Sequence, residues 1–225
     1  MTAAVLDNAV WHSLTGAHHE FAEHAGTACR YQPDVSVFAA VDAFDDASWR
    51  DLATLVGRAG SAVLFRADIA TPPSTFASLG GGVGHQMVLR ELAPVSTPAA
   101  RRLGAADTPQ MMALVELTQP GPFRPRTVEL GNYLGVFQDG ALVAMAGERL
   151  RLPGYTEISA VCTHPEHRGK GLAAGLTALV ARGIRARGAT PFLHHAVDNH
   201  PARRIYEALG FEFRREVGIA VVGVA

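Results

Sequence analysis

Apolar positions in the first hundred residues repeat with two periods, which predicts alternating helices and strands. Helical spacing marks residues 10–25, where Asp7 can cap the helix, and residues 48–56. Short runs rich in Val, Leu and Phe predict strands at residues 35–41, 61–66 and 86–90. The intervening stretch 69–84 is rich in Pro, Ser, Thr and Gly, which is typical of a loop. This region is therefore predicted to form a β-α-β unit.

The second half has a different order. A proline-containing linker around residues 93–98 precedes a helix that begins at Asp107 or Thr108, with Pro109 in its first turn. Further expected elements are a loop at 120–126, a hairpin turning at residues 138–140, a strand at 155–163, a helix to about 187, a strand at 191–197, a helix at 199–209, and a closing hairpin of strands 211–215 and 217–224. A helix, antiparallel strands and then a βαβ unit predict an α+β fold: a mixed, mostly antiparallel sheet flanked by helices.

Residues 161–173 combine the end of a strand, a tight turn and the start of an apolar helix. The first N–H groups of a helix lack internal partners, and the helix dipole adds partial positive charge there. Gly169 and Gly171 leave the backbone open to close approach, while Arg168 and Lys170 add formal charge. This arrangement predicts a binding site for a phosphate group.

Two motifs in this half match a known pattern. The run Arg168-x-x-Gly171-x-Ala173 resembles the pyrophosphate-binding motif of the GNAT superfamily of N-acetyltransferases. The segment 199–211, which contains Tyr-Glu-Ala-Leu-Gly-Phe, is similar to the late helix of that family. The resemblance extends from about Asp107 to the C-terminus, and its details resemble the subgroup related to glycine N-acyltransferases. It implies a GNAT-like acyl-CoA N-acyltransferase fold and acetyl-CoA as cosubstrate.

The resemblance also implies residue roles. Three segments would bind the cofactor: a strand edge that pairs with the pantetheine arm, the loop and helix start that hold the phosphates, and the late helix. Their cofactor-binding residues would be Val161, Cys162, Thr163, Arg168, Gly169, Lys170, Gly171, Leu172, Ala173, Ala174, Asn199 and Tyr206. Tyr206 is the candidate general acid beside the sulfur of CoA, since a phenol can donate a proton to a departing thiolate. A core tyrosine and a plain helix cap are the structural alternatives for Tyr206 and Asn199.

The base is the less defined part of the predicted site. Glu157 shares a strand face with the cofactor edge, and a buried carboxylate there would have a raised pKa and could accept the amine proton. A structural carboxylate bound to arginine is the alternative, and His194, His195 or water could also take the proton. Arg124 and Arg126 lie in a loop that could bind an acidic acceptor, or could simply be exposed.

The expected function is transfer of an acetyl or short acyl group from acetyl-CoA to a primary amine of a small molecule, amino acid or protein. We expect direct attack in a ternary complex, because no nucleophile is placed for a covalent step; Cys162 has no evident partners for acyl transfer. A non-catalytic acyl-CoA-binding or sensor module is the alternative. A nucleotide site is disfavoured because the turn lacks the Walker pattern.

Residues 105–225 are expected to form the acetyltransferase domain, and residues 1–100 an N-terminal α/β extension. That extension is either a degenerate half of the same fold or a separate element that caps the acceptor pocket or mediates a homodimer. A net charge of −1 and the absence of a basic arm give no reason to expect nucleic acid or an anionic membrane as partner. No secretory or membrane-spanning segment and no metal-ligand cluster is evident, and His18, His19 and His24 are expected on a solvated helix face. Cys29 and Cys162 are expected as buried thiols of a cytoplasmic protein.

Overall fold

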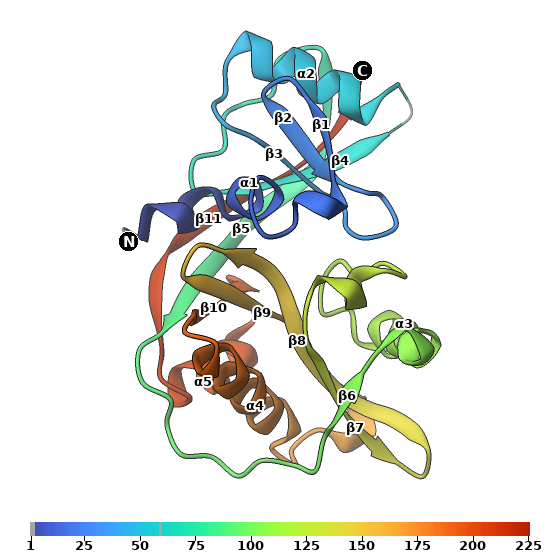
Figure 1. The fold of residues 1–225 in the computed structure, drawn as a ribbon, viewed down its shortest axis with the longest axis vertical. Helices are drawn as coiled ribbons and strands as arrows, with labels where there is room; N and C mark the ends of the chain where they lie inside the picture. Colours follow the sequence, from blue (N-terminus) through green and yellow to red (C-terminus); the bar gives the residue numbers. More distant parts are fainter. Residues whose placement is uncertain (1–2, 59) are drawn as a thin grey trace.

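The computed structural model describes residues 3–58 and 60–225, which build one eleven-stranded sheet flanked by helices (Figure 1). Its strand order is β1-β2-β3-β4-β11-β5-β10-β9-β8-β7-β6. The strands are β1 (Ala22–Ala25), β2 (Ala28–Tyr31), β3 (Phe38–Val41), β4 (Ser61–Arg66), β5 (Phe76–Leu89), β6 (Arg101–Leu103), β7 (Tyr133–Gln138), β8 (Ala141–Leu152), β9 (Tyr155–Thr163), β10 (Thr190–Ala196) and β11 (Phe211–Val224). Only the β3/β4 and β9/β10 pairings are parallel among these, so the predicted mixed, mostly antiparallel sheet is confirmed.

The α-helices cover both faces of this sheet. They are α1 (Ala9–Leu14), α2 (Asp46–Val56), α3 (Thr108–Thr118), α4 (Leu172–Ala186) and α5 (His200–Ala208), and short 3-10 turns occupy Ala3–Asn8 (η1), His19–Phe21 (η2), Ala105–Asp107 (η3), Thr127–Leu130 (η4) and Pro165–His167 (η5). Helices α4 and α5 lie together against β8–β11, around a core that contains Leu176, Ile184 and Tyr206 (Figure 1). Helices α1 and α3 pack against β8 around other clusters of buried side chains. None of the helices in these residues is long and apolar enough to cross a lipid bilayer.

The two halves of the chain exchange strands at the middle of the sheet. Strand β5 comes from the N-terminal half but pairs with β10, while β11 comes from the C-terminal half and pairs with β4 as well as with β5. In each half, an antiparallel pair is followed by a parallel strand–helix–strand unit: β2-β3-α2-β4 and β8-β9-α4-β10. The division at residues 100–105 stays a prediction, but the sheet itself runs continuously across it.

Three sequence-based expectations about elements were wrong. The helix expected over residues 10–25 ends at Leu14, and residues 22–25 form β1. The chain turns there because the backbone N–H groups of Gly16 and His18 both donate to Ser13 O. Residues 76–84 were assigned to a loop, yet they form β5, since β11 supplies hydrogen-bond partners along the whole segment. The closing hairpin is instead one strand, β11, with an irregularity between Phe213 and Arg215, because no turn residues interrupt it.

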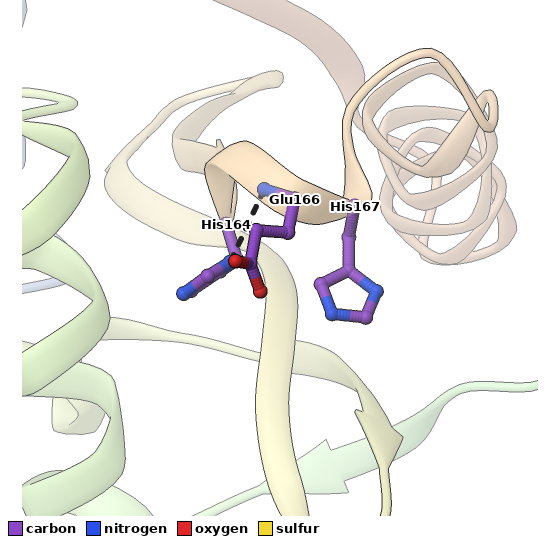
Figure 2. Close-up of side chains that lie close together, drawn as sticks. All are labelled: His164, Glu166 and His167. Carbon is purple, nitrogen blue, oxygen red and sulfur yellow. Dashed lines mark hydrogen bonds between the residues drawn. The ribbon is translucent and has the colours of Figure 1, made fainter.

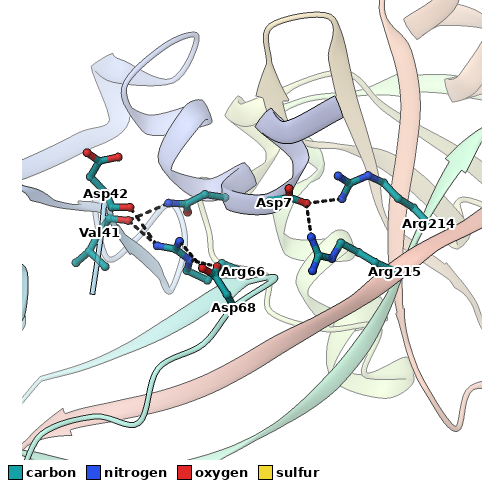
Figure 3. Close-up of polar contacts among 8 residues, drawn as sticks. Asp7, Val41, Asp42, Arg66, Asp68, Arg214 and Arg215 are labelled. Carbon is teal, nitrogen blue, oxygen red and sulfur yellow. Dashed lines mark hydrogen bonds and ion pairs between the residues drawn. The ribbon is translucent and has the colours of Figure 1, made fainter. Parts of the chain in front are cut away.

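The N-terminal turn is fastened to both halves by polar contacts (Figure 3). The Asp7 carboxylate accepts from Arg214 and Arg215 of β11, at 2.7 and 2.9 Å. The Asn8 amide donates to Val41 O at 2.9 Å, and Arg66 of β4 donates to the same carbonyl at 3.2 Å. The N-terminal segment is therefore fixed over the middle of the sheet, beside the site described next.

Candidate active site

Strands β9 and β10 diverge halfway along their length. They pair from Tyr155 to Ile158, and beyond that β9 follows β8 while β10 follows β5. At the divergence, residues 160 and 161 of β9 oppose a single residue of β8, and Ala160 has φ +51°. This β-bulge turns the backbone of residues 159–163 toward the gap between the strands.

The turn after β9 brings an uncapped helix end to the same gap. Gly171 is the N-cap of α4 with φ +73°, and no side chain bonds to the helix end. The first helical hydrogen bond runs from Gly175 N to Gly171 O, so the amides of residues 172–174 have no partner within the helix. A side chain at Gly169 or Gly171 would meet open space. These features fit a phosphate group bound at the helix N-terminus.

A cavity of about 790 Å³ passes through the gap and reaches both faces of the sheet. Of the residues that the sequence nominated for cofactor binding, those that line it are Val161, Cys162, Thr163, Arg168, Gly169, Gly171, Leu172, Ala173, Ala174, Asn199 and Tyr206. Lys170 does not line it; its Nζ atom lies 3.5 Å from His167 Nδ1 on the outer side of the turn. Asn199 also caps α5, since its side chain accepts from Ala202 N at 3.2 Å.

Tyr206 lies in the cavity wall on the α4 side of the sheet, with 7% of its surface exposed. Its ring packs against Phe211 and His195. Burial raises the pKa of the Tyr206 hydroxyl to about 12, and the nearby Cys162 adds to this shift. The phenol therefore stays protonated near neutral pH and is available as a hydrogen-bond donor. Burial likewise raises the pKa of the Cys162 thiol to about 11, so this cysteine is not an activated nucleophile.

The expectation that Glu157 has a raised pKa was wrong. Glu157 is fully buried and accepts two hydrogen bonds from Arg149, from Nε to Oε2 at 2.7 Å and from Nη2 to Oε1 at 2.6 Å. Burial acts to raise the pKa of this carboxyl, but Arg149 and His194 outweigh it and hold the pKa at about 2. Glu157 does not line the cavity, because Arg149 and His194 lie between this carboxylate and the cavity.

His194 continues this chain of contacts. Its Nδ1 atom lies 2.7 Å from Glu157 Oε1 and its Nε2 atom 3.0 Å from the side-chain nitrogen of Gln86. A carboxylate only accepts, so Nδ1 carries the proton and the single lone pair of Nε2 accepts from Gln86. Burial lowers the pKa of His194 against the opposing pull of Glu157. His194 is thus a neutral imidazole with both nitrogens engaged.

His195 faces the opposite side of β10, toward Tyr206. Its Nδ1 atom lies 2.8 Å from Ala196 O, and its Nε2 atom is buried without a partner in the described part of the chain. Burial lowers the pKa of this imidazole too. The two histidines therefore line the cavity on opposite faces of β10.

Sequence reasoning missed the far wall of the cavity. It is lined by Phe38 of β3, Val63 and Phe65 of β4, Ile219 of β11 and Arg149. Residues 118–122, from the end of α3 into the expected 120–126 loop, form one rim. No local motif marks these residues, because they converge only through the exchanged strands. Arg149 did carry a signal, since an arginine within a strand of buried residues requires a partner.

The loop arginines that the sequence suggested for the acceptor stand elsewhere. Arg124 is exposed and does not line the cavity. Arg126 is bound by Glu129, Asp34 and Gln32. His18, expected on a solvated face, is buried and lies within hydrogen-bond distance of Ser13, Tyr31 and Leu130 O.

Three side chains cluster on η5, beside the phosphate turn (Figure 2). One ligand atom each of His164, Glu166 and His167 lies within 4.8 Å of the others, a spacing compatible with a shared cation. His164 Nδ1 accepts from the backbone N–H of Glu166 and so caps this turn, and His167 contacts Lys170. These contacts tie the side chains of His164 and His167 into the turn.

Comparison with known proteins agrees with this geometry. A family model described as FR47-like protein matches residues 133–218. A crystal structure of a GNAT-family acetyltransferase from Novosphingobium aromaticivorans is 38% identical, covers 98% of each chain and superposes with a TM-score of 0.90. The chain belongs to the GNAT family. It is an acyl-CoA-dependent N-acyltransferase, and GNAT acetyltransferases use acetyl-CoA as cosubstrate and an amine as acceptor.

More distant GNAT structures share the fold over nearly the whole chain. A GCN5-related N-acetyltransferase from Kribbella flavida is 21% identical with a TM-score of 0.65 and covers 97% of this chain and 95% of its own. A GCN5-related N-acetyltransferase-like protein from Streptococcus suis is 13% identical with a TM-score of 0.53, and covers 97% and 96% respectively. No curated protein matches the chain significantly.

Proposed function

We propose that this GNAT protein transfers an acetyl or short acyl group to a primary amine by direct attack within a ternary complex. The observation that carries the proposal is one continuous cavity, which joins the uncapped N-terminus of α4 to an aromatic wall on the opposite face of the sheet. Two substrates that enter from opposite faces would meet at the gap between β9 and β10. That arrangement favours direct transfer over a covalent enzyme intermediate.

The cofactor end is assigned from its donors. The amides of residues 172–174 and the Arg168 guanidinium would hold the pyrophosphate, and the backbone of residues 161–163 would pair with the pantetheine arm. Acetyl-CoA supplies an activated thioester carbonyl when bound. A backbone N–H at the β9 bulge would polarise that carbonyl, as preorganised donors do in acyl transfer.

Proton movements follow from the surroundings of each group. Tyr206 would donate its hydroxyl proton toward the departing sulfur, since it lies in the cavity wall and stays protonated near neutral pH. Glu157 is held ionised by Arg149, and the lone pair of His194 Nε2 is engaged by Gln86. We therefore infer that neither of these two side chains takes the proton of the amine. Water, or the Nε2 atom of His195 in the cavity wall, which has no partner among the described residues, accepts it, and Glu157 and His194 position Arg149 and the cavity wall.

We further infer that the N-terminal half is a GNAT-like half that has lost the cofactor site. Its β3-α2-β4 unit repeats the pairing of β9-α4-β10. The start of α2, however, is closed by Asp45, whose carboxylate accepts from Ser48 N at 2.8 Å, and Asp46 follows in the first turn. An acidic, capped helix end repels phosphate, so only α4 is suited to the cofactor. The two-half arrangement agrees with a resemblance to relatives of glycine N-acyltransferases.

Calorimetric titration with acetyl-CoA, with CoA and ATP as comparisons, tests the proposed function. We expect micromolar binding of acetyl-CoA and CoA and weak or absent binding of ATP, followed by release of CoA when an amine acceptor is added. Absence of acetyl-CoA binding would remove the cofactor assignment. Binding without turnover on any amine would indicate an acyl-CoA sensor.

A further inference from the structure

The acceptor end of the cavity carries a charge pattern that restricts the substrate. Among the described residues that line the cavity there is no Asp or Glu, whereas Arg168 lies at the phosphate end and Arg149 at the opposite end. An acceptor that entered as a multiply charged cation would meet no carboxylate in this wall. The acceptor is therefore recognised through other parts of its structure than its ammonium group.

Arg149 is presented to the acceptor end by an irregularity in β8. Residues 149 and 150 together oppose Glu157 of β9, so the strand bulges at this point. The guanidinium uses Nε and Nη2 to bind Glu157, and its centre lies 4.8 Å from the centroid of the Phe38 ring. No described residue accepts from Nη1, although the residue is only 9% exposed and lines the cavity. A guanidinium has two edges that can bind a carboxylate, and one of them is still available here.

An apolar wall surrounds this free edge. Phe38 and Phe65 stack with ring centroids 5.7 Å apart, and Val63 and Ile219 complete the wall. The rings of His194 and Phe65 lie with their centroids 4.4 Å apart. Because the His194 imidazole is neutral, it adds no charge to this wall. Because β3 and β4 supply most of these side chains, the wall belongs to the N-terminal half.

We propose that the acceptor is a primary amine that also carries a carboxylate and an apolar ring-sized or branched group, an apolar α-amino acid being the simplest member. Its carboxylate binds the free edge of Arg149, and its apolar group packs against Phe38 and Phe65. Its amine then points toward the gap between β9 and β10. This inference rests on the proposed function, because it assigns the acceptor of that same cavity.

Three acceptors separate the parts of this inference: phenylalanine, phenethylamine and glycine. Phenethylamine lacks only the carboxylate, and glycine lacks only the apolar group. With acetyl-CoA fixed at saturation, we expect kcat/KM for phenylalanine to exceed that of each other amine by about tenfold or more, as one charge-assisted contact or one buried ring provides. Phenethylamine equal to or better than phenylalanine would overturn the role of Arg149, and glycine equal to phenylalanine would overturn the apolar wall.

Variants assign the discrimination to residues. Arg149→Lys keeps the charge beside Glu157 but loses the forked edge, and is expected to reduce the preference for phenylalanine over phenethylamine. Phe65→Leu is expected to reduce the preference for phenylalanine over glycine. Arg90→Lys is the matched control, because Arg90 pairs with Glu212 on the surface away from the cavity. If Arg149→Lys does not fold, the Phe65 variant and the acceptor series still decide the outcome.

The proposed function and this inference fail in different ways. If both the proposed function and the proposed acceptor class are wrong, calorimetry will detect no binding of acetyl-CoA. If acetyl-CoA binds and an amine without a carboxylate is acetylated best, or if none of the three amines is acetylated, the acceptor class is wrong while the cofactor assignment stands.

Discussion

Single residues near the cavity owe their chemistry to partners that are distant in the sequence. Glu157 has the residue type of a general base, yet Arg149 and His194 hold its pKa at about 2. Burial among apolar groups raises the pKa of the Tyr206 phenol to about 12, so this side chain holds its proton near neutral pH. The residue type therefore indicated which side chains could act as acid or base, while their neighbours in space set the pKa of each.

Gly171→Asp tests the phosphate end of the cavity. An added carboxylate at the N-cap of α4 would occupy the anion site, so we expect the Kd for acetyl-CoA to rise by about a hundredfold or more. Gly188→Asp is the control, since Gly188 also has positive φ (+79°) and open space around it but lies at the far end of α4. Calorimetry measures both, and an unchanged Kd for Gly171→Asp would remove this loop from the cofactor site.

Tyr206→Phe tests the proposed acid. The ring contacts with Phe211 and His195 remain, and only the hydroxyl is lost. We expect kcat to fall by about ten- to a hundredfold, with the Kd for acetyl-CoA within about twofold of the original. Steady-state rates and calorimetry give the two values. Equal turnover would mean that the hydroxyl donates no proton in the reaction.

His18 makes a pH-dependent contribution to stability. Burial lowers its pKa to about 4, with Arg151 adding to the shift. Between about pH 6.5 and 4 the unfolded chain binds a proton at His18 that the folded chain does not, so folding stability falls as pH is lowered through this window. The full shift corresponds to about 3 kcal/mol. We expect His18→Gln to show a shallower decline in urea unfolding free energy over this range; parallel pH profiles would contradict it.

Elements with strong local signals were predicted well, and elements that depend on a distant partner were not. The strands 61–66 and 155–163 have the expected bounds, and α3 and α5 begin at the expected caps and prolines. Helix α2 ends at the expected Val56 but begins at Asp46, two residues before the expected start. Residues 76–84 of β5 were missed because a glycine-rich segment has little strand propensity of its own, and pairing with β11 supplies the hydrogen bonds that hold it extended.

Two neighbouring glycines of β5 should respond very differently to the same substitution. At Gly81, with φ +157°, an added Cβ would lie 2.3 Å from Ile219 O of β11, whereas at Gly82 it would meet nothing within 4 Å. We expect Gly81→Ala to lower the unfolding free energy by about 2 kcal/mol or more, and Gly82→Ala to change it by less than about 0.5 kcal/mol. Urea denaturation measures both; equal effects would contradict the β5–β11 register.

At the scale of the whole molecule, the exchange of β5 and β11 joins two halves into one sheet. The wall from β3 and β4 that we propose for the acceptor stands opposite the proposed cofactor end only because of this exchange. The bonds of Asp7 to Arg214 and Arg215 add a second connection between the ends of the chain.

The fragment 105–225 should therefore not fold independently. It lacks β5, whose loss leaves facing edges of β10 and β11 without hydrogen-bond partners. We expect the fragment to lack a cooperative thermal transition by circular dichroism, while the full chain has one. Adding a fragment 1–104 in trans is expected to restore it. A stable, cooperatively folding 105–225 fragment would show that the exchange is dispensable.

The sequence by itself determined the end of the cavity that we assign to the cofactor. Glycines, a helix start and a late tyrosine helix are local signals, since consecutive residues create the phosphate site and its flanking strand. Tertiary structure alone decided the acceptor end and the ionisation of Glu157 and His194. Those properties arise from contacts such as Arg149 with Phe38 and His194 with Gln86, which join residues about a hundred positions apart. Pairings of that range depend on which strands meet in the sheet, and no periodicity within one segment encodes them.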